Sequence, residues 1–257
     1  NPSDPDAGYS GHKGQGYQVQ VMETYRPEAE EENPTPKLKL ITHVQVEPAH
    51  QSDAHALIPA LEATAERGLG PEEVLTDALY GSDENCEAAK EMGVEVVSPV
   101  KGTPTEKVLL LTEFEFAESG KVLQCPQGHA PVKVKEKKNR FTASFELAAC
   151  QDCPRRGECP VVPGKRHFYL RYDRKAVRLA KRRAYEETPE FRERYRFRAG
   201  IEGTISAYEA RTGVKELRVR GLKAVRFCAT LKAMGINIFR AVVVRKALRE
   251  GSEALAF

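Results

Sequence analysis

The sequence predicts an α/β fold with a layered core, in one large domain or in one domain that carries an insertion. Between residues 16 and 100 two strand patterns, a helix, a strand, a helix and a strand follow one another. This order is typical of a sheet covered by helices. The length of 257 residues suits such a domain. Hydrophobic residues make up 40% and charged residues 30%, which allows a core and a well-solvated surface.

Each element of this core has a local signal. Residues 16–22 and 37–48 alternate between apolar and polar, which predicts the two strands of a hairpin around the acidic loop 25–36. Residues 52–67 begin with a Ser–Asp cap and continue with apolar residues at helical spacing. Short strands are expected at 73–80 and 94–100. Between them we expect a helix over 82–93 that Ser82 caps and Gly93 ends.

The pattern changes at residue 101. Residues 101–168 hold short polar strands and a cluster of cysteines, which predicts an inserted subdomain. Residues 169–257 return to helical signals and include a long amphipathic stretch over 221–249. We therefore expect a first part of the core in 1–100, an inserted Cys-rich subdomain in 101–168, and a C-terminal helical part of the core in 169–257.

Charge is distributed unevenly along the chain. Residues 1–100 carry 6 basic and 19 acidic residues, whereas residues 101–257 carry 34 basic and 18 acidic ones. The asymmetry is typical of a protein with a polyanion-facing half, or of two solvated faces of opposite sign. No apolar run approaches the roughly 18–20 residues of a bilayer span, so no transmembrane helix is expected. The first residues do not resemble a signal peptide, and because they lack a starting Met we expect a piece of a longer protein.

Asp77 stands where a buried strand is expected to end, after Val74 and Leu75 and before a Tyr–Gly turn into the next helix. Ligands of α/β sheets bind at the carboxyl ends of the strands. Asp77 is therefore a candidate metal ligand. The alternative is an ordinary turn aspartate, and this stretch alone favours the alternative.

A second carboxylate lies in the helical pattern of residues 195–213. Tyr195, Arg198 and Glu202 are spaced so that they share one helix face. An arginine beside a carboxylate can orient it or bind a phosphate. The alternative is an ion pair on a solvated face.

The cysteine cluster predicts a metal site in the insertion. Cys150 and Cys153 have the spacing of a zinc knuckle, with Cys159 shortly after them and Cys125 before them. Four thiolates, or three with His129, can form a tetrahedral structural zinc site. A polar insertion with few strands also needs a stabilising link such as a bound metal ion. The alternative is buried thiols.

The two remaining cysteines, Cys86 and Cys228, stand alone in helical context. Together with the cluster, they disfavour a disulfide framework.

Residues 165–198 form a basic stretch with 13 Lys or Arg residues, 5 acids and interleaved aromatics. Contacts of such side chains with phosphates give salt-dependent nucleic-acid binding. Lys181, Arg182 and Arg183 are candidate DNA contacts in this stretch. The alternative is a solvated basic helix with its aromatic residues in the core.

Three segments together resemble the DDE transposases of bacterial insertion sequences. "TDALYGSDEN" resembles the second-aspartate motif of this family, and Tyr195-x2-Arg198-x3-Glu202 is similar to its third-acid signature. The opening "DPDAGYSGHKGQGYQVQV" resembles the segment that leads into the second strand of these catalytic domains. The family's signature continues with a Lys where this chain has Glu209, with Arg211 two residues on. The order and separation of the motifs extend the resemblance over residues 4–245.

The resemblance implies a ribonuclease-H-like mixed sheet flanked by helices, with an inserted zinc-ribbon-like subdomain. It implies hydrolysis and strand transfer at transposon ends with Mg²⁺ or Mn²⁺, because two such ions activate the nucleophile and stabilise the leaving oxygen. Asp77 and Glu202 would hold the metals, and Tyr195, Arg198 and Arg211 would contact DNA. The expected partners are transposon ends and target DNA, with a homodimer and without a membrane. The expected location is the bacterial cytoplasm, at the nucleoid when the protein is bound to DNA.

The first acid of the family has no counterpart in this chain. In relatives it lies in an Asp-Gly-Thr-like strand ahead of the segment that Asp4 and Asp6 match, so neither is assigned to it. We therefore expect a fragment or a decayed copy that does not cleave DNA alone. One alternative is a non-catalytic, transposase-derived DNA-binding protein with a structural zinc site. A third is a soluble α/β protein whose cysteine cluster is a protein-interaction module.

Overall fold

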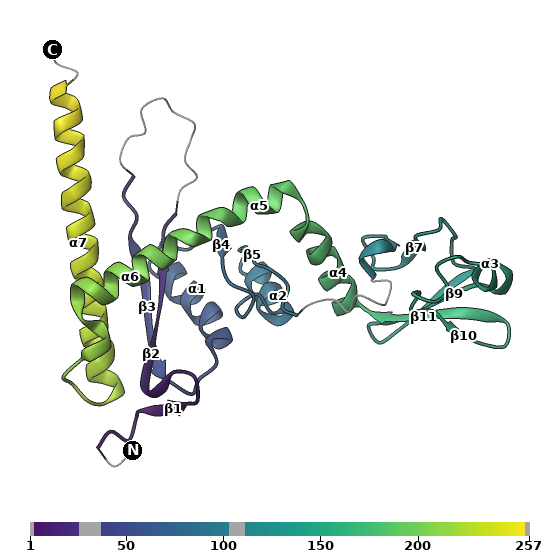
Figure 1. Cartoon of the computed structure of the whole chain (residues 1–257), viewed down its shortest axis with the longest axis horizontal. Coiled ribbons are helices and arrows are strands. Elements are labelled where there is room, and N and C mark those ends of the chain that lie inside the picture. Colours follow the sequence, from purple (N-terminus) through teal and green to yellow (C-terminus); the bar gives the residue numbers. More distant parts are fainter. Residues whose placement is uncertain (1–2, 26–36, 103–110, 255–257) are drawn as a thin grey trace.

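A computed structural model describes residues 3–25, 37–102 and 111–254, and the side chains as far as residue 250. The chain forms two lobes joined by one helix, α4 (Figure 1). The first lobe begins with β1 (Gly8–Ser10), β2 (Gly14–Glu23), β3 (Ile41–Pro48), a 3-10 turn η1 (Asp53–Ala56), α1 (Leu57–Ala65), β4 (Glu73–Leu75), α2 (Asp83–Glu91) and β5 (Glu95–Val97).

The second lobe, residues 111–173, is called the Cys subdomain below. It contains η2 (Leu111–Glu113), β6 (Glu115–Phe116), β7 (Val122–Gln124), β8 (Lys133–Lys137), β9 (Arg140–Glu146), α3 (Leu147–Gln151), β10 (Val162–Pro163) and β11 (His167–Asp173). The chain then returns to the first lobe through α4 (Arg174–Glu186), α5 (Pro189–Tyr195), η3 (Arg196–Ala199), α6 (Gly200–Thr212), η4 (Val214–Glu216) and α7 (Leu222–Ala254). The domain boundaries expected at 100 and 168 stay a prediction.

The first lobe has two small sheets. β1, β2 and β3 form an antiparallel sheet, in which Tyr17–Glu23 of β2 pairs with β3. β4 and β5 form a separate parallel pair. The predicted hairpin and the α/β class are confirmed, with the strands spread over several small sheets. Most of the predicted acidic loop, residues 26–36, lies outside the described residues.

The helices of this lobe begin partly as expected. Ser82 caps α2 by accepting a hydrogen bond from the Asn85 N–H (3.1 Å), and Gly93 follows with a positive φ of 77°. The expected Ser–Asp cap at residue 52 is wrong, because Ser52 makes no side-chain cap bond. The Asp53 carboxylate instead accepts hydrogen bonds from Lys13 (2.6 Å) and Gln20 (3.2 Å).

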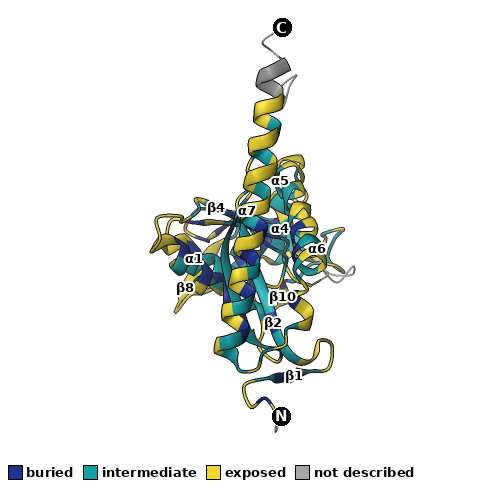
Figure 2. Ribbon diagram, turned by 90° about the vertical axis from the view of Figure 1, so that its left-hand side faces the viewer, coloured by how far each residue is buried: buried dark blue, intermediate teal, exposed yellow. Residues whose placement is uncertain are grey.

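α7 packs its first half against β3. Val46 and Ala229 are fully buried in this cluster, and Asn237 hydrogen-bonds both backbone groups of Ile41 at 2.8 Å. The second half extends beyond the lobe and is mostly exposed (Figure 2). Residues 222–250 form a helix that is long and apolar enough to cross a membrane by length and composition alone, because one 18-residue window in it has a mean hydropathy of 1.5. Core helices of soluble proteins meet the same criterion.

The Cys subdomain has its own core beneath a four-stranded antiparallel sheet in the order β10-β11-β9-β8. One face of this sheet carries the buried residues Phe141, Phe145, Leu170 and Tyr172, and β7 covers them with Val122. The hairpin between β8 and β9 turns through Lys138 and Asn139, both with positive φ. This is the geometry of a two-residue type I′ turn.

α4 connects the two lobes through a set of ionic contacts. It begins directly after β11, where Asp173 caps it through the Ala176 N–H (2.7 Å). Arg178 then binds both carboxylate oxygens of Asp83 at the start of α2 (2.9 and 2.6 Å). Such a bidentate pair restricts orientation as well as distance, so the direction of α4 is set by α2.

Candidate active site

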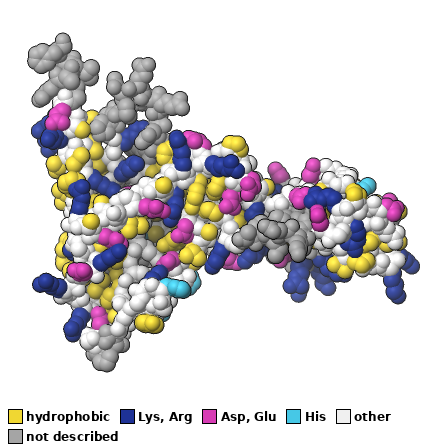
Figure 3. All heavy atoms as spheres, viewed as in Figure 1, with side chains coloured by type: hydrophobic (Ala, Val, Ile, Leu, Met, Phe, Trp, Pro, Cys, Tyr) yellow, Lys and Arg dark blue, Asp and Glu magenta, His cyan; other side chains and the backbone are white. Residues whose placement is uncertain are grey.

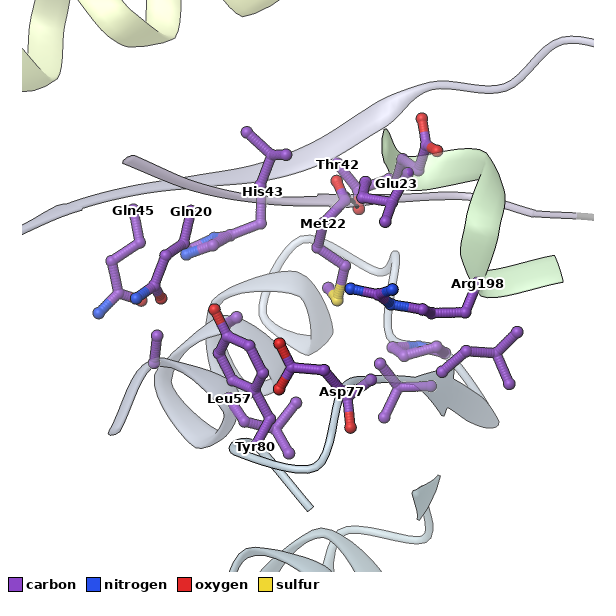
Figure 4. Close-up of a pocket in the computed structure, with 18 of the residues that line it drawn as sticks. Gln20, Met22, Glu23, Thr42, His43, Gln45, Leu57, Asp77, Tyr80 and Arg198 are labelled. Carbon is purple, nitrogen blue, oxygen red and sulfur yellow. Dashed lines mark hydrogen bonds between the residues drawn. The ribbon is translucent and has the colours of Figure 1, made fainter. Parts of the chain in front are cut away.

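A cavity of about 740 Å³ lies between β2 and β4, and we call it the slot (Figure 4). Its lining includes every residue of Gln18–Tyr25 and of Glu72–Asp77. Side chains alternate between the two faces of a strand, so a cavity lined by consecutive residues meets each strand at its edge. Tyr17–Glu23 pairs with β3 on one side, and β4 pairs with β5. Within the described ranges, neither strand has a strand partner on its other side along these residues.

Buried polar atoms without hydrogen-bond partners also lie around the slot. Among the described residues, four buried side-chain atoms lack a hydrogen-bond partner, and all belong to residues that line the slot: Gln20 Oε1, His43 Nε2, Gln45 Oε1 and Thr76 Oγ1. A buried polar atom without a partner costs about 1–3 kcal/mol. Gln20, His43 and Gln45 lie at one end of the cavity (Figure 4). The slot is therefore suited to an occupant with hydrogen-bonding groups.

Asp77 lies two residues beyond the end of β4. Its Oδ1 accepts a hydrogen bond from the Leu79 N–H (2.8 Å), and its carbonyl accepts one from Gly81 (3.3 Å). Oδ1 therefore stabilises the turn, as in an ordinary turn aspartate. The carboxylate as a whole points into the slot (Figure 4). The turn requires glycine at position 81, because a Cβ there would lie 1.6 Å from the Ser98 hydroxyl.

Arg198 enters the slot from the opposite side, on the helical run α5–η3–α6 (Figure 4). Its Nη1 forms an ion pair with Glu202 Oε1 at 2.9 Å, which confirms the predicted Arg–Glu neighbourhood. The Glu202 side chain is 68% exposed, so the pair faces solvent at the slot's margin. Within the described residues, Asp77 and Arg198 form no ion pair within 4 Å.

Tyr195 connects these groups electrostatically. Burial raises the pKa of Tyr195, Arg198 opposes this shift, and the charges of Asp77 and Glu202 add to it. The charge of Asp77 therefore reaches Tyr195 together with those of Arg198, Glu186 and Glu202, although Asp77 is far from them in sequence. The side chain stays protonated at neutral pH and can donate a hydrogen bond.

Asp77 and Glu202 provide hard oxygen ligands of the kind that Mg²⁺ prefers. Among the described residues there is no group of three or more His, Cys, Asp or Glu side chains arranged to hold a metal ion. The acids of the opening segment are used elsewhere. Asp4 Oδ2 accepts a hydrogen bond from the Gly221 N–H (3.2 Å), and Asp6 Oδ2 accepts one from the Leu222 N–H (3.0 Å), at the start of α7. Neither supplies a third ligand beside Asp77.

The remaining residues that were expected to contact DNA lie outside the slot and differ in their contacts. Arg182 binds the Gly81 carbonyl (2.9 Å) and the Ser98 hydroxyl (2.9 Å), so its guanidinium holds the Asp77 turn against α4. Lys181 is exposed, and Arg183 is bonded to the Gly102 carbonyl (3.4 Å). Arg211 stacks over the Phe239 ring at 4.2 Å. Their contact with DNA stays a prediction.

The four clustered cysteines are neighbours in the Cys subdomain, and all six cysteines of the chain are free thiols. Cys125, Cys150 and Cys159 pack at the border of its core. Burial raises the pKa of Cys150 to about 11, and the thiols of Cys159, Cys125 and Cys153 contribute to the shift. The Cys125 turn is closed by a hydrogen bond from the Gly128 N–H to its carbonyl (2.8 Å).

The raised pKa of Cys150 gives a pH dependence for the metal-free chain. In the unfolded chain the thiol titrates near its ordinary value of 9.0, and in the folded chain near 11. The folded state therefore retains a proton that the unfolded state loses. The free energy of unfolding is expected to fall as pH rises from about 9 to about 11. Chemical denaturation of the wild type and of Cys150→Ser measures this, and equal slopes in that window would contradict it.

Sequence reasoning missed the slot and its polar residues. Gln20 and Gln45 lie in alternating Gln–Val patterns, which indicate a solvent-facing side of a strand. Only the separation of β2 from β4 in space turns that side into a cavity. No local signal in the sequence records this separation.

Residues 124–242 match the family described as Transposase DDE domain. The match includes the cysteine cluster, α4 and the helix of Glu202, whereas Asp77 precedes it. No curated protein and no solved structure was found to match. The match, together with the mixed α/β fold, supports a DDE transposase.

Proposed function

We propose that the chain is the catalytic-domain part of a DNA transposase that hydrolyses phosphodiester bonds at transposon ends and transfers the strands to target DNA. The observation that carries this proposal is that Asp77 and Arg198 both line the slot, with Arg198 paired to Glu202, in a chain whose residues 124–242 match a transposase DDE domain. The proposal includes a homodimer that acts on paired DNA ends. Its place would be the bacterial cytoplasm, at the nucleoid when bound to DNA.

In this proposal Asp77 and Glu202 hold Mg²⁺ or Mn²⁺. The bound ions would supply activation of an oxygen nucleophile and stabilisation of the leaving oxygen. The Leu79 N–H orients the Asp77 carboxylate through Oδ1. Arg198 orients Glu202 and has a planar guanidinium that can also bind a phosphate.

We further propose that a β-strand from outside the described residues fills the slot and carries the first acid. The strand would pair with β2 on one side and β4 on the other, and so join the two sheets. Two unpaired strand edges and four unsatisfied polar side chains support this occupant. Among the described residues no three carboxylates are arranged to hold a metal ion, and this supports an incomplete site.

We also propose that Cys125, Cys150, Cys153 and Cys159 hold a structural Zn²⁺. Support comes from the mutual influence of the four thiols on the pKa of Cys150 and from the tight turn at Cys125. The described side chains are not arranged as a metal-binding group, so the ion would have to draw the thiols together. The alternative ligand, His129, is exposed, which favours the four thiols. The bound ion would hold together the loops that frame the small core of the Cys subdomain.

The experiment that tests the function combines a nicking assay with a DNA-binding titration of the 257-residue chain. We expect salt-dependent binding of duplex DNA and no Mg²⁺-dependent cleavage by the chain alone. Cleavage that is lost in Asp77→Ala would contradict the incomplete site but support the transposase. Absence of DNA binding would contradict the transposase and favour a protein-interaction module.

The alternative function is a non-catalytic, transposase-derived DNA-binding protein with a structural zinc site. The binding titration does not separate it from the transposase, but complementation does. Cleavage that appears when a segment with the missing strand is supplied supports the transposase. Continued absence of cleavage, with DNA binding and slot occupancy retained, supports the alternative.

A further inference from the structure

The four-stranded sheet of the Cys subdomain has a second face, opposite its core, that no described element covers. The strand register defines this face because paired residues point to the same side. Lys133 lies opposite Ser144, Lys135 opposite Thr142, and Lys137 opposite Arg140. On β11 the register adds Tyr169 and Arg171 to the same face. We call it the outer sheet face.

The outer sheet face is strongly basic. Its cations lie on three adjacent strands and are all exposed: Lys133, Lys135, Lys137, Arg140 and Arg171. Within the described residues none of the five forms an ion pair within 4 Å. Glu136, the one acid of β8, points to the other side and binds Arg174 (2.5 Å). Lys and Arg side chains project from the lower side of this lobe in Figure 3.

Acidic residues stand only at the ends of this face. Glu146 and His167 form the pair at one end, and Asp173 lies opposite Arg140 at the other. The Asp173 carboxylate already caps α4, so its charge is engaged. The centre of the face therefore carries uncompensated positive charge in the regular spacing of a strand, roughly 6–7 Å between alternate residues.

An aromatic side chain lies among these cations. The Arg171 guanidinium lies 5.8 Å from the centre of the Tyr169 ring, and the His167 ring contacts the same tyrosine edge-on. A flat side chain between cations on an open sheet suits contact with sugar and base edges as well as with phosphates.

We propose that the outer sheet face binds the phosphate backbone of duplex DNA, as a contact surface separate from the slot. The occupant is a polyanion with regularly spaced charges, because the cations are regularly spaced and form no ion pair with the described residues. Flexible lysines act as point charges, which suits backbone contact without sequence readout. The choice of DNA as the polyanion rests on the proposed function.

The test compares salt dependence of DNA binding in the full chain. Lys133→Gln, Lys135→Gln and Lys137→Gln are combined in one variant. Each lost phosphate contact lowers the slope of log affinity against log salt by about 1, so the slope falls by about 3 and affinity at 0.1 M salt by roughly 100-fold. The matched control combines Lys90→Gln, Lys101→Gln and Lys121→Gln, three exposed lysines outside the outer sheet face. A second variant replaces the same three lysines with Arg and keeps their charge, so it should retain the slope. Retention of the slope would show that the loss of binding in the Gln variant comes from lost charge and not from misfolding.

The outcomes separate this inference from the proposed function. If the wild type binds DNA and the sheet variant has an unchanged slope, the outer sheet face is not a DNA contact surface. The proposed transposase function is not affected by that result. Equal losses in the sheet variant and the control also overturn it, because net charge then explains the effect. If the wild type itself binds no duplex DNA, both proposals are wrong.

Discussion

Removal of the proposed Zn²⁺ from the cysteine cluster is expected to unfold the Cys subdomain while the first lobe stays folded. The subdomain core is small, and its loops carry the four thiols at its border. Structural zinc contributes about 10–16 kcal/mol of apparent binding free energy at neutral pH, more than a small domain gains from its core. Hydrogen exchange of β8–β11 after chelation, or in Cys153→Ser, measures the loss of protection.

The lone cysteines provide the control for this experiment. Cys86→Ser and Cys228→Ser remove a thiol from α2 and α7 without touching the cluster, and we expect normal protection in the Cys subdomain of both. Full protection of β8–β11 after chelation would contradict a structural metal. So would purified protein that contains neither zinc nor iron.

Asp77→Asn is expected to lower metal-dependent DNA cleavage by about 10³-fold once the proposed first-acid strand is supplied. The substitution keeps the size of the side chain and its acceptor for the Leu79 N–H, and it removes the negative charge. Metal-ion stabilisation of a phosphodiester transition state amounts to several kcal/mol, and about 4 kcal/mol corresponds to about 10³-fold in rate. Single-turnover cleavage of labelled DNA measures the effect, with DNA affinity determined in parallel.

Glu72→Gln is the matched control. Glu72 is exposed and also lines the slot, so the variant removes one carboxylate charge near the same cavity. Its cleavage rate is expected to stay within a few-fold of the wild type. Equal losses in the two variants would mean that charge in the slot, and not metal binding by Asp77, controls cleavage. Unchanged cleavage in Asp77→Asn would remove Asp77 from the catalytic site.

The parts of the fold that sequence could predict are those with local causes. The α2 helix follows from a Ser82 cap and a terminal Gly93, and both act within a few residues of the helix. The pairing of Arg198 with Glu202 follows from helical spacing alone. Ser52 carried the same signal as Ser82 and failed, because Lys13 in the turn before β2 and Gln20 on β2 engage the neighbouring Asp53.

The parts that sequence could not predict depend on relations between distant segments. The slot exists because β2 and β4 stand apart, and no residue pattern encodes the distance between two strands. The basic run that contains Arg182 did not indicate that its guanidinium bonds Gly81 and Ser98, and its predicted contact with DNA stays a prediction. Charge in a sequence shows how many cations a segment has, whereas the packing decides which of them the protein itself engages.

The bidentate contact of Arg178 with Asp83 has a consequence for how DNA would lie on the molecule. α4 has 13 residues, a length of about 20 Å, and this contact prevents it from swinging relative to α2. At 3.4 Å per base pair, that length corresponds to about six base pairs. A duplex held at both lobes would then show two protected patches in a footprint, separated by a constant interval. Arg178→Ala removes this contact and is expected to make the interval between the two patches variable, while the protection of each patch is retained.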